Sequence, residues 1–389
     1  MKRSVLPGQV RDGQMATLGV MGGGQLGRMF VHAAQAMGFN TAVLDPDLAS
    51  PAGGVSHHHV QTDYLDAQGL AQLAQCCAAV TTEFENVPAP ALSTLAAHVP
   101  VAPDAHAVAI AQDRAAEKAH FVRCGVPVAA HAVIQTPAQL QAVGADLLPG
   151  ILKTARMGYD GKGQIRVKTL ADLHAAWAQL QQVPCVLEKM LPLQAECSVI
   201  VARGADGQMV NFPVQLNLHR EGILAVTSVY EGAVEPALAA QVTAATRAIA
   251  EGLNYVGVLC VEFFILDGGQ WVVNEMAPRP HNSGHYTQDA CDQSQFECQV
   301  RTLAGLPLTP PRQHSSAIML NLLGELWPEN GAPPWDQVLA LPGTHLHLYG
   351  KLAARAGRKM GHLNITGPSP ESVRSTALQA AALLGIAAF

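Results

Sequence analysis

The start of the chain contains a strand, a glycine-rich loop, a helix and a second strand in immediate succession. The apolar residues 16–21 predict a strand, and residues 22–28, GGGQLGR, predict a loop. Residues 29–38 predict a helix that ends on glycine, and residues 41–44 predict the second strand. This order is typical of a parallel, doubly wound layer covered by helices. The chain is therefore expected to begin with a Rossmann-like α/β domain.

The rest of the chain predicts two α+β units. Strands are expected on either side of a glycine-rich loop at 158–164, followed by a helix and a further strand. Strands then dominate until a helix over 237–253, and a last helix is expected over 370–384. We expect an N-terminal extension, a Rossmann-like domain, a central lobe and a C-terminal lobe, with boundaries at 1–14, 15–112, 113–195 and 196–389.

Composition excludes several classes of protein. The 389 residues carry a formal net charge of −6 and no basic run, so a nucleic-acid partner is not expected. The eight cysteines form no C-x-x-C pair, which favours free thiols in a reducing cytosol. No apolar run reaches transmembrane length, so no membrane partner is expected. The three histidines at 57–59 are expected in a solvated loop, because neighbouring side chains of a strand face opposite ways.

Two carboxylates lie at the polar ends of two neighbouring apolar runs. The runs, 255–264 with Glu262 and 271–273 before Glu275, are joined by an Asp-Gly-Gly turn at 267–269, which predicts a β-hairpin. Paired strands can aim both carboxylates and the amide of Asn274 at one point, and such oxygen ligands suit Mg²⁺. A dense polar run over 279–285 follows, so we predict a metal site beside an anionic substrate rather than a solvated hairpin.

The first glycine-rich loop leaves two interpretations open. Its glycines fit G-x-G-x-x-G over 22–27, and Asp45 ends the next strand, where a ribose-binding acid would lie. An NAD-dependent oxidoreductase is therefore an alternative. The same turn can also hold another anion, because glycines allow close approach and a helix N-terminus favours negative charge.

Two basic segments predict phosphate sites. Lys153 ends an apolar strand five residues before the loop at 158–164, whose amides could close over a polyphosphate. Lys351, Arg358 and Lys359 lie close together among glycines near the C-terminus, which suits a phosphate monoester.

The order of these motifs resembles the ATP-grasp enzymes, from about residue 16 to about residue 367. The segment NEMAPRPHNSGH over 274–285 is similar to those members that carboxylate 5-aminoimidazole ribonucleotide in purine biosynthesis. The resemblance implies a Rossmann-like domain, a small ATP-clamping lobe and a C-terminal mixed α+β lobe. It also implies a cytoplasmic homodimer with ATP, bicarbonate and the ribonucleotide as substrates, and Mg²⁺, replaceable by Mn²⁺, as the metal.

The resemblance also assigns residues. Glu262 and Glu275 would hold the metal. The backbone from Glu188 to Leu191 would bind the adenine base of ATP, and Glu196 would bind its ribose. The full set implied for ATP is Arg114, Lys153, Gly158, Tyr159, Asp160, Gly161, Lys162, Gly163, Gln164, Glu188, Lys189, Met190, Leu191, Glu196, His219, Asn274 and Glu275. The set implied for the ribonucleotide is Gln25, Glu85, Tyr159, Arg279, His281, Asn282, Ser283, Lys351 and Arg358.

The implied reaction phosphorylates bicarbonate with ATP, and the exocyclic amine of the ribonucleotide then takes up the released CO₂. Lys153 and Arg279 would act as fixed cations, and Asp160 would orient the amine. The loop at 158–164 would exclude water from the labile carboxyphosphate. The alternatives are an ATP-grasp ligase that uses formate or glycine, and the oxidoreductase considered above.

Overall fold

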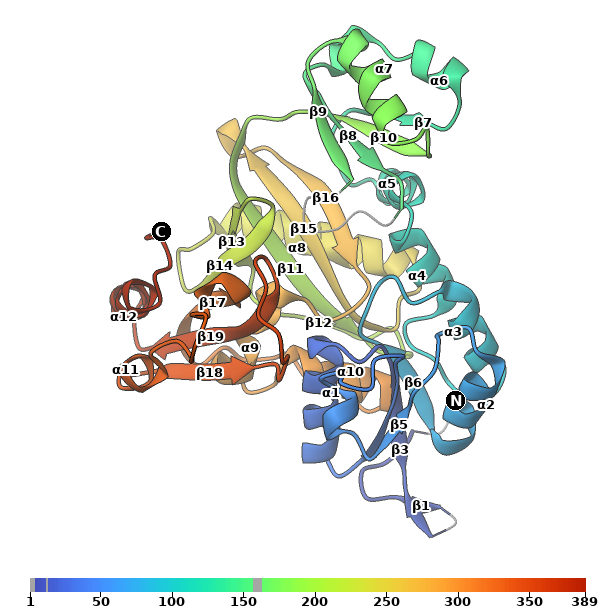
Figure 1. The fold of residues 1–389 in the computed structure, drawn as a ribbon, viewed down its shortest axis with the longest axis vertical. Helices are drawn as coiled ribbons and strands as arrows, with labels where there is room; N and C mark the ends of the chain where they lie inside the picture. Colours follow the sequence, from blue (N-terminus) through green and yellow to red (C-terminus); the bar gives the residue numbers. More distant parts are fainter. Residues whose placement is uncertain (1–3, 12, 157–162) are drawn as a thin grey trace.

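The computed structural model describes residues 4–11, 13–156 and 163–389. In Figure 1 a parallel sheet lies at the bottom, a small antiparallel lobe at the top, and a large antiparallel sheet between them and to the left. The predicted combination of an α/β layer with α+β units is confirmed. No helix in these ranges is long and apolar enough to cross a membrane.

The first sheet has the strand order β5-β4-β3-β6, and all its pairs are parallel. Its strands are β3 (Thr17–Met21), β4 (Asn40–Leu44), β5 (His58–Val60) and β6 (Ala79–Thr82). The helices of this part are α1 (Gln25–Ala36), α2 (Ala67–Cys76), α3 (Ala89–Ala96) and α4 (Ala105–Ala111). Strands β3 and β4 are almost wholly buried, as expected for a parallel sheet covered on both faces.

Two local predictions in this domain are wrong. The first helix begins at Gln25 rather than at residue 29, because the carboxylate of Glu83 accepts the amides of Gly24 and Gly27 and completes the helix N-terminus. Residues 58–60 form the edge strand β5 rather than a loop. Their ring nitrogens bond to the main chain: His57 Nδ1 accepts from Thr41 N at 3.2 Å, and His59 Nε2 lies 3.0 Å from Asp45 O.

The described residues of the N-terminal extension form a small sheet and contact the body of the molecule. Strands β1 (Val10–Arg11) and β2 (Gln14–Met15) form a two-stranded sheet. The buried Val5 donates its amide to Ala304 O at 2.8 Å. This segment therefore packs at the end of a helix that also reaches the large sheet.

The central lobe is an antiparallel sheet of order β7-β10-β8-β9. Its strands are β7 (His131–Ile134), β8 (Gly150–Thr154), β9 (Gln164–Val167) and β10 (Cys185–Lys189). Helix α5 (Arg114–Arg123) leads into the lobe, and α6 (Pro137–Gln141) and α7 (Leu170–Gln179) belong to it. Trp177 and Leu173 of α7 pack on Leu152 of β8, so the lobe has its own core.

The large sheet runs β16-β15-β11-β13-β14-β17-β19-β18, with β12 paired to β11. All its pairs are antiparallel. Its first strands are β11 (Leu193–Arg203), β12 (Met209–Asn211), β13 (Gln215–Arg220), β14 (Ile223–Val229), β15 (Gly257–Leu266) and β16 (Trp271–Ala277). Its last strands are β17 (Ser316–Leu323), β18 (Thr344–Leu348) and β19 (Lys359–Gly367).

Helices cover this sheet and connect it to the parallel domain. They are α8 (Pro236–Gly252), α9 (Thr287–Ala290), α10 (Gln295–Ala304), α11 (Trp335–Leu339) and α12 (Pro370–Leu383). Val242 and Ile249 of α8 pack on strands β11 and β15. Val300 and Leu303 of α10 pack on Phe30 of α1, so α10 fixes the two sheets against each other. This packing allows residues of both sheets to build one site.

Candidate active site

The hairpin predicted around Glu262 and Glu275 is confirmed. Strands β15 and β16 are antiparallel neighbours, and Glu262 lies directly opposite Glu275, next to a register shift that follows Glu262. Glu262 is buried, whereas the side chain of Glu275 is 42 % exposed. Burial, together with the negative charge of Glu275, raises the pKa of Glu262 to about 7. A positive charge that enters the site would therefore stabilise the ionised form of Glu262.

The oxygen atoms at this hairpin fit a hard divalent cation. Asn274 lies between the carboxylates in sequence, and its Oδ1 is buried with no hydrogen-bond partner among the described residues. The described ranges hold no group of three His, Cys, Asp or Glu side chains able to bind a metal by themselves. Two carboxylates and an amide oxygen instead match the incomplete protein shell that Mg²⁺ accepts when phosphate oxygens and water supply the rest.

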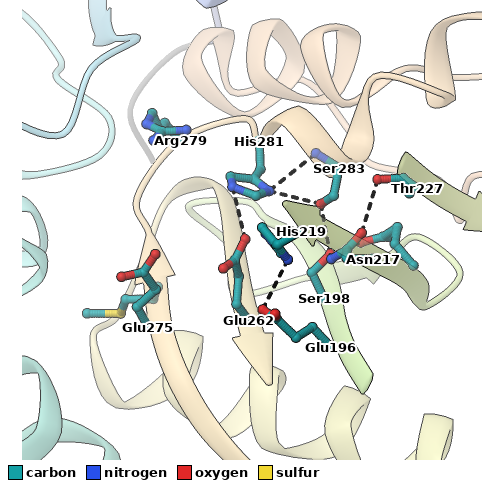
Figure 2. A network of polar contacts seen from close by, with 12 residues as sticks. Glu196, Ser198, Asn217, His219, Thr227, Glu262, Glu275, Arg279, His281 and Ser283 are labelled. Carbon is teal, nitrogen blue, oxygen red and sulfur yellow. Dashed lines mark hydrogen bonds and ion pairs between the residues drawn. The ribbon is translucent and has the colours of Figure 1, made fainter. Parts of the chain in front are cut away.

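Each of the two carboxylates has a basic partner from another segment, and Figure 2 shows the partner of Glu262, His281. Arg114 Nη1, at the start of α5, lies 3.2 Å from Glu275 Oε2. His281 Nε2 lies 3.1 Å from Glu262 Oε1. Burial, then the charge of Arg279, holds the pKa of His281 well below its usual range, so this imidazole is neutral.

A cavity of about 270 Å³ lies between the central lobe and the large sheet. It brings together most of the described residues that the sequence assigns to ATP. Among its lining residues are Arg114, Lys153, Gln164, Glu188, Lys189, Met190, Leu191, Glu196, His219, Glu262, Asn274 and Glu275. Gly163 lies next to the cavity residue Gln164, with a φ of +72°. Gly158, Tyr159, Asp160, Gly161 and Lys162 are outside the described residues.

The floor of this cavity contains a buried carboxylate between two ammonium groups. Glu188 on β10 lies 2.9 Å from Lys153 Nζ of β8 and 2.9 Å from Lys118 Nζ of α5. Burial opposes ionisation of Glu188, but the two lysines outweigh it and hold its pKa at about 2. The sequence analysis missed Lys118. Its spacing of four from Arg114, on one face of a helix, was the available signal.

The strand edge beyond Glu188 and a nearby ion pair shape the rest of the cavity. The amides of Lys189 and Met190 donate to Ala130 O and Pro149 O, whereas that of Leu191 has no acceptor among the described residues. His219 Nδ1 lies 3.1 Å from Glu196 Oε2. Burial disfavours the imidazolium, but the contact with Glu196 prevails and raises the pKa of His219.

A second cavity, of about 140 Å³, adjoins the first. The two share Arg114, Glu262, Glu275, His281 and Lys359 in their linings. Glu85 and Arg279 line the second cavity and form an ion pair with each other. Burial opposes the ionisation of Glu85, but Arg279 outweighs it and lowers the pKa of Glu85. The carboxylate pair therefore stands in the wall between the two cavities.

The remaining residues assigned to the ribonucleotide are more scattered. Asn282 lines the first cavity, and both amide atoms of its side chain are buried without a hydrogen-bond partner in the described ranges. Ser283 is fully buried. Lys351 Nζ donates to Lys359 O at 2.7 Å, and Arg358 Nη1 donates to Ala353 O at 2.7 Å. Neither of these two basic residues, nor Gln25, is among the residues that line the two cavities.

Two residues missed by the sequence analysis join the cavities to their surroundings. Lys359 lines both cavities, whereas the sequence pattern marks it only as a member of the basic cluster with Lys351 and Arg358. Glu117 is buried, and its Oε1 accepts the amide of Met276 at 2.7 Å, which fixes β16 to α5. Burial raises the pKa of Glu117 to about 8. A carboxyl in a helix gives no sequence signal of such a long-range contact.

The glycine-rich loop at 22–27 is filled by carboxylates of the chain itself. Gly24 N donates to Glu83 Oε1 at 2.8 Å and Gly27 N to Glu83 Oε2 at 3.1 Å. Gly23 N donates to Asp45 Oδ2 at 2.6 Å. A Cβ on Gly24 would lie 2.5 Å from Glu83 Oε1, so a larger residue there would displace this carboxylate. These contacts occupy the amides that a dinucleotide would need, and they argue against the oxidoreductase alternative.

Models of three protein families match the chain. The ribonucleotide synthetase preATP-grasp domain matches residues 15–112, and the ATP-grasp domain matches residues 119–296. The phosphoribosylaminoimidazole carboxylase C-terminal domain matches residues 317–376.

Curated proteins and solved structures point the same way. The chain is 40 % identical to N5-carboxyaminoimidazole ribonucleotide synthase of Brucella melitensis, over 94 % of this chain and 99 % of the relative. It is 43 % identical to the enzyme of the same name from Pseudomonas aeruginosa, over 90 % of this chain and 94 % of the relative.

Two crystal structures show the same likeness in three dimensions. An ADP complex of an N5-carboxyaminoimidazole ribonucleotide synthetase has a TM-score of 0.89 and 38 % identity, and the match covers 98 % of both chains. The Aspergillus clavatus enzyme in complex with ADP and 5-aminoimidazole ribonucleotide has a TM-score of 0.86 and 31 % identity, over 95 % of this chain and 99 % of that one.

Proposed function

The chain belongs to the N5-carboxyaminoimidazole ribonucleotide synthase family of ATP-grasp ligases, and we propose that it performs the reaction of that family. In this reaction ATP and bicarbonate carboxylate the exocyclic amine of 5-aminoimidazole ribonucleotide, giving the N5-carboxyamino product, ADP and phosphate. The observation that carries the proposal is the pair of adjoining cavities with Glu262 and Glu275 in their common wall.

The first cavity is proposed as the ATP site. The free amide of Leu191 and the carbonyl groups of the same strand edge would bind the base, and Glu196 would bind the ribose. Lys153 and Arg114 would face the phosphates, where guanidinium and ammonium groups stabilise transferred charge. His219, which contacts Glu196, would be a further nucleotide-binding residue of this cavity. The remaining proposed ATP residues, Gly158 to Lys162, belong to the loop outside the described residues.

Glu262, Glu275 and the amide oxygen of Asn274 are proposed to hold Mg²⁺ between the two cavities. When bound, Mg²⁺ would neutralise charge on the phosphate oxygens during phosphoryl transfer. The protein's own part is to fix these oxygen atoms, and the cross-strand pairing of Glu262 with Glu275 supports that role. Arg114, now on Glu275, is proposed to move to the phosphates when the cation is present.

The second cavity is proposed as the place where bicarbonate and the ribonucleotide meet. Arg279 would stabilise the anionic carboxyphosphate, and Glu85, its ion-pair partner, would bind the ribose of the substrate. Asn282, whose buried side-chain amide has no partner among the described residues, would donate to the carboxylate group, and His281 is proposed to lie beside it. Gln25, Lys351 and Arg358 are proposed around the ribose and phosphate of the same substrate, and Tyr159 and Asp160 from the loop beside it.

The chemistry needs a closed site and no covalent bond to the enzyme. ATP phosphorylates bicarbonate, and the resulting carboxyphosphate decomposes to CO₂ and phosphate. The amine attacks the CO₂ carbon, forms the C–N bond and loses a proton, for which Asp160 is the proposed acceptor. The ATP cavity and the substrate cavity adjoin each other at Glu262 and Glu275. This arrangement supports a short path from the phosphoryl group of ATP to bicarbonate.

Four broader expectations remain part of the proposal. The functional divisions are proposed at 1–14, 15–112, 113–195 and 196–389. The protein is proposed to act in the cytoplasm, as a homodimer, with no nucleic acid or membrane as partner. Light scattering of the purified protein would test the dimer.

The decisive experiment measures ADP release with bicarbonate, with and without 5-aminoimidazole ribonucleotide, and identifies the product. Carboxylated ribonucleotide formed one to one with ADP is the expected result. Parallel reactions with formate or glycine in place of bicarbonate test the other ATP-grasp ligases. Turnover that requires formate or glycine would overturn the assignment.

A further inference from the structure

A chain of buried polar side chains lies behind His281 (Figure 2). Thr227 on β14 donates to Asn217 Oδ1 at 3.0 Å, and Asn217 Nδ2 on β13 donates to Ser198 Oγ at 2.8 Å. Ser198 Oγ on β11 lies 2.8 Å from Ser283 Oγ. Ser198, Thr227 and Ser283 are 0 % exposed. A polar path therefore crosses three strands of the core and ends at a residue of the site.

The contacts of His281 identify which ring nitrogen carries its proton. The backbone amide of Ser283 donates to His281 Nδ1 at 3.3 Å. An amide N–H can only donate, so Nδ1 must present a lone pair, and the proton of the neutral ring lies on Nε2. The hydroxyl of Ser283, 2.9 Å from the same nitrogen, must then also donate to it.

The rest of the chain favours the same direction. Ser198 Oγ accepts from Asn217. The hydroxyl hydrogen of Ser198 therefore points away from Asn217, toward Ser283 or toward Gln215 Oε1 at 3.0 Å. The amide of Gln215 is oriented by its donation to Pro213 O. Once Ser283 donates to His281, its oxygen can accept from Ser198. The single hydrogen of Ser198 points either to Ser283 or to Gln215, and in both arrangements the hydrogen of Ser283 can be donated to His281.

The protonated nitrogen of His281 faces a carboxylate of the proposed cation site. Its Nε2 lies 3.1 Å from Glu262 Oε1. The hydroxyl of Ser283 contacts Ser198, His281 and the buried thiol of Cys260. Ser283 itself is not among the residues that line the two cavities. Ser283 can therefore reach the reaction through His281, although its sequence position suggests a substrate contact.

We propose that Ser283, supported by Ser198 and Asn217, is a positioning residue that keeps the proton of His281 on Nε2, so that His281 donates to Glu262 and fixes the orientation of that carboxylate. The role of Glu262 toward a cation rests on the proposed function, whereas the tautomer of His281 does not. Groups behind a metal ligand orient it, and their loss weakens metal binding.

The test reads the tautomer and the cation affinity separately. In protein with ¹⁵N-labelled histidine, two-bond ¹H–¹⁵N spectra distinguish protonated from unprotonated ring nitrogens, and His281→Gln assigns the signal. Wild-type protein is expected to show Nε2 protonated. Ser283→Ala is expected to give a mixture of tautomers and to weaken Mn²⁺ binding in the presence of ADP, measured by electron paramagnetic resonance, by about 10-fold.

Two variants serve as controls. Ser283→Thr keeps the hydroxyl and should restore both readouts. Thr246→Val removes another fully buried hydroxyl, which donates to Val242 O at 2.8 Å within α8, and should change neither. In steady-state kinetics Ser283→Ala should lower kcat and leave the KM for the ribonucleotide unchanged.

Several outcomes would overturn the proposal. A wild-type proton on Nδ1 of His281 would do so, as would a Ser283→Ala variant with unchanged tautomer and Mn²⁺ affinity. A raised KM for the ribonucleotide with an unchanged tautomer would make Ser283 a substrate contact. If Ser283→Ala does not fold, the wild-type tautomer and the same two readouts in Ser198→Ala decide. Failure of the wild-type carboxylation assay would count against the proposed function alone.

Discussion

Arg114 and Glu275 are 161 positions apart in the sequence, and the guanidinium of one lies 3.2 Å from the carboxylate of the other. The side chain of Arg114 is 12 % exposed, so its charge is poorly solvated and gains from the contact. Both residues line both cavities. The contact therefore connects helix α5, which leads into the central lobe, to the hairpin of the large sheet at the point where a cation and phosphates are proposed to bind.

The first prediction concerns the proposed cation site. Glu275→Gln keeps the shape of the side chain and removes its charge, so Mg²⁺-dependent ADP release should fall on the order of 100-fold. The fold should persist, because the side chain of Glu275 is half-exposed and its strand is held by pairing with β15. Glu231→Gln, at an exposed glutamate, is the matched control. ADP release near the wild-type rate in Glu275→Gln would remove this residue from the cation site.

The second prediction concerns the pH dependence of substrate binding. Burial, followed by the charge of Arg358, lowers the pKa of Lys351 to about 8. The free enzyme therefore loses this cation as the pH rises through about 8, and the KM for the ribonucleotide should increase over that range while the KM for ATP stays constant. Lys351→Arg should remove the dependence, because a guanidinium stays protonated.

Truncation tests the same cluster at fixed pH. Lys351→Ala and Arg358→Ala should each raise the KM for the ribonucleotide by roughly 10-fold to 100-fold, the usual range for a hydrogen bond to a charged group. An equal rise in the KM for ATP would assign these residues to the nucleotide site instead.

The third prediction concerns the buried ion triad. Lys118→Met removes one of two cations from Glu188, which is 4 % exposed, and should lower the free energy of unfolding by about 2–3 kcal/mol. Arg312→Met breaks an exposed ion pair, in which Arg312 Nε lies 3.7 Å from Asp292 Oδ2. It should change the free energy of unfolding by less than about 0.5 kcal/mol. Urea unfolding of both variants compares them, and equal effects would contradict the prediction.

The same triad has a pH signature. The pKa of Glu188 is held at about 2, below its ordinary value of 4.5, so its ionisation favours the folded state above pH 4.5. This contribution is lost as the pH falls from 4.5 toward 2. The stability difference between wild type and Lys118→Met should therefore shrink over that range.

The fourth prediction concerns Asp160, which lies outside the described residues. Asp160→Asn removes a negative charge and keeps the size of the side chain. Most of the proposed ATP contacts, Lys153 and Leu191 among them, lie on other residues, so bicarbonate-dependent ADP formation should continue while carboxylation falls. The ratio of ADP to carboxylated product measures this uncoupling. A ratio of one, with normal carboxylation, would leave Asp160 without a role in the chemistry.

The sequence predicts those parts of the site that follow from local patterns. The hairpin pattern alone places Glu262 and Glu275 on neighbouring strands, since antiparallel strands joined by a short turn have a defined register. The register shift after Glu262, which sets it opposite Glu275 rather than Asn274, could not be predicted in this way. Lys118, Glu117 and Glu83 could not be assigned in this way. Their partners, Glu188, Met276 and the glycine loop, are brought to them by tertiary packing.

The histidines at 57–59 show the opposite error. Polar residues favour a loop in a local analysis, yet His58 and His59 lie in an edge strand that pairs with β4, and only His57 precedes it. The basic residues Lys351 and Arg358 were easy to notice as a cluster. Their distance from the two described cavities, in contrast to Lys359, depends on the turn before β19 and could not be predicted.

The carboxylates of Glu83 and Asp45, which accept the amides of the first glycine-rich loop, have a consequence for inhibitor design. An acidic fragment aimed at this edge of the parallel sheet would meet two negative groups instead of open amides. Burial raises the pKa of Glu83, so the region disfavours additional negative charge. A compound for this edge should therefore carry hydrogen-bond donors or a positive charge, and its acidic group should be directed toward Arg279 and Lys359, which line the second cavity.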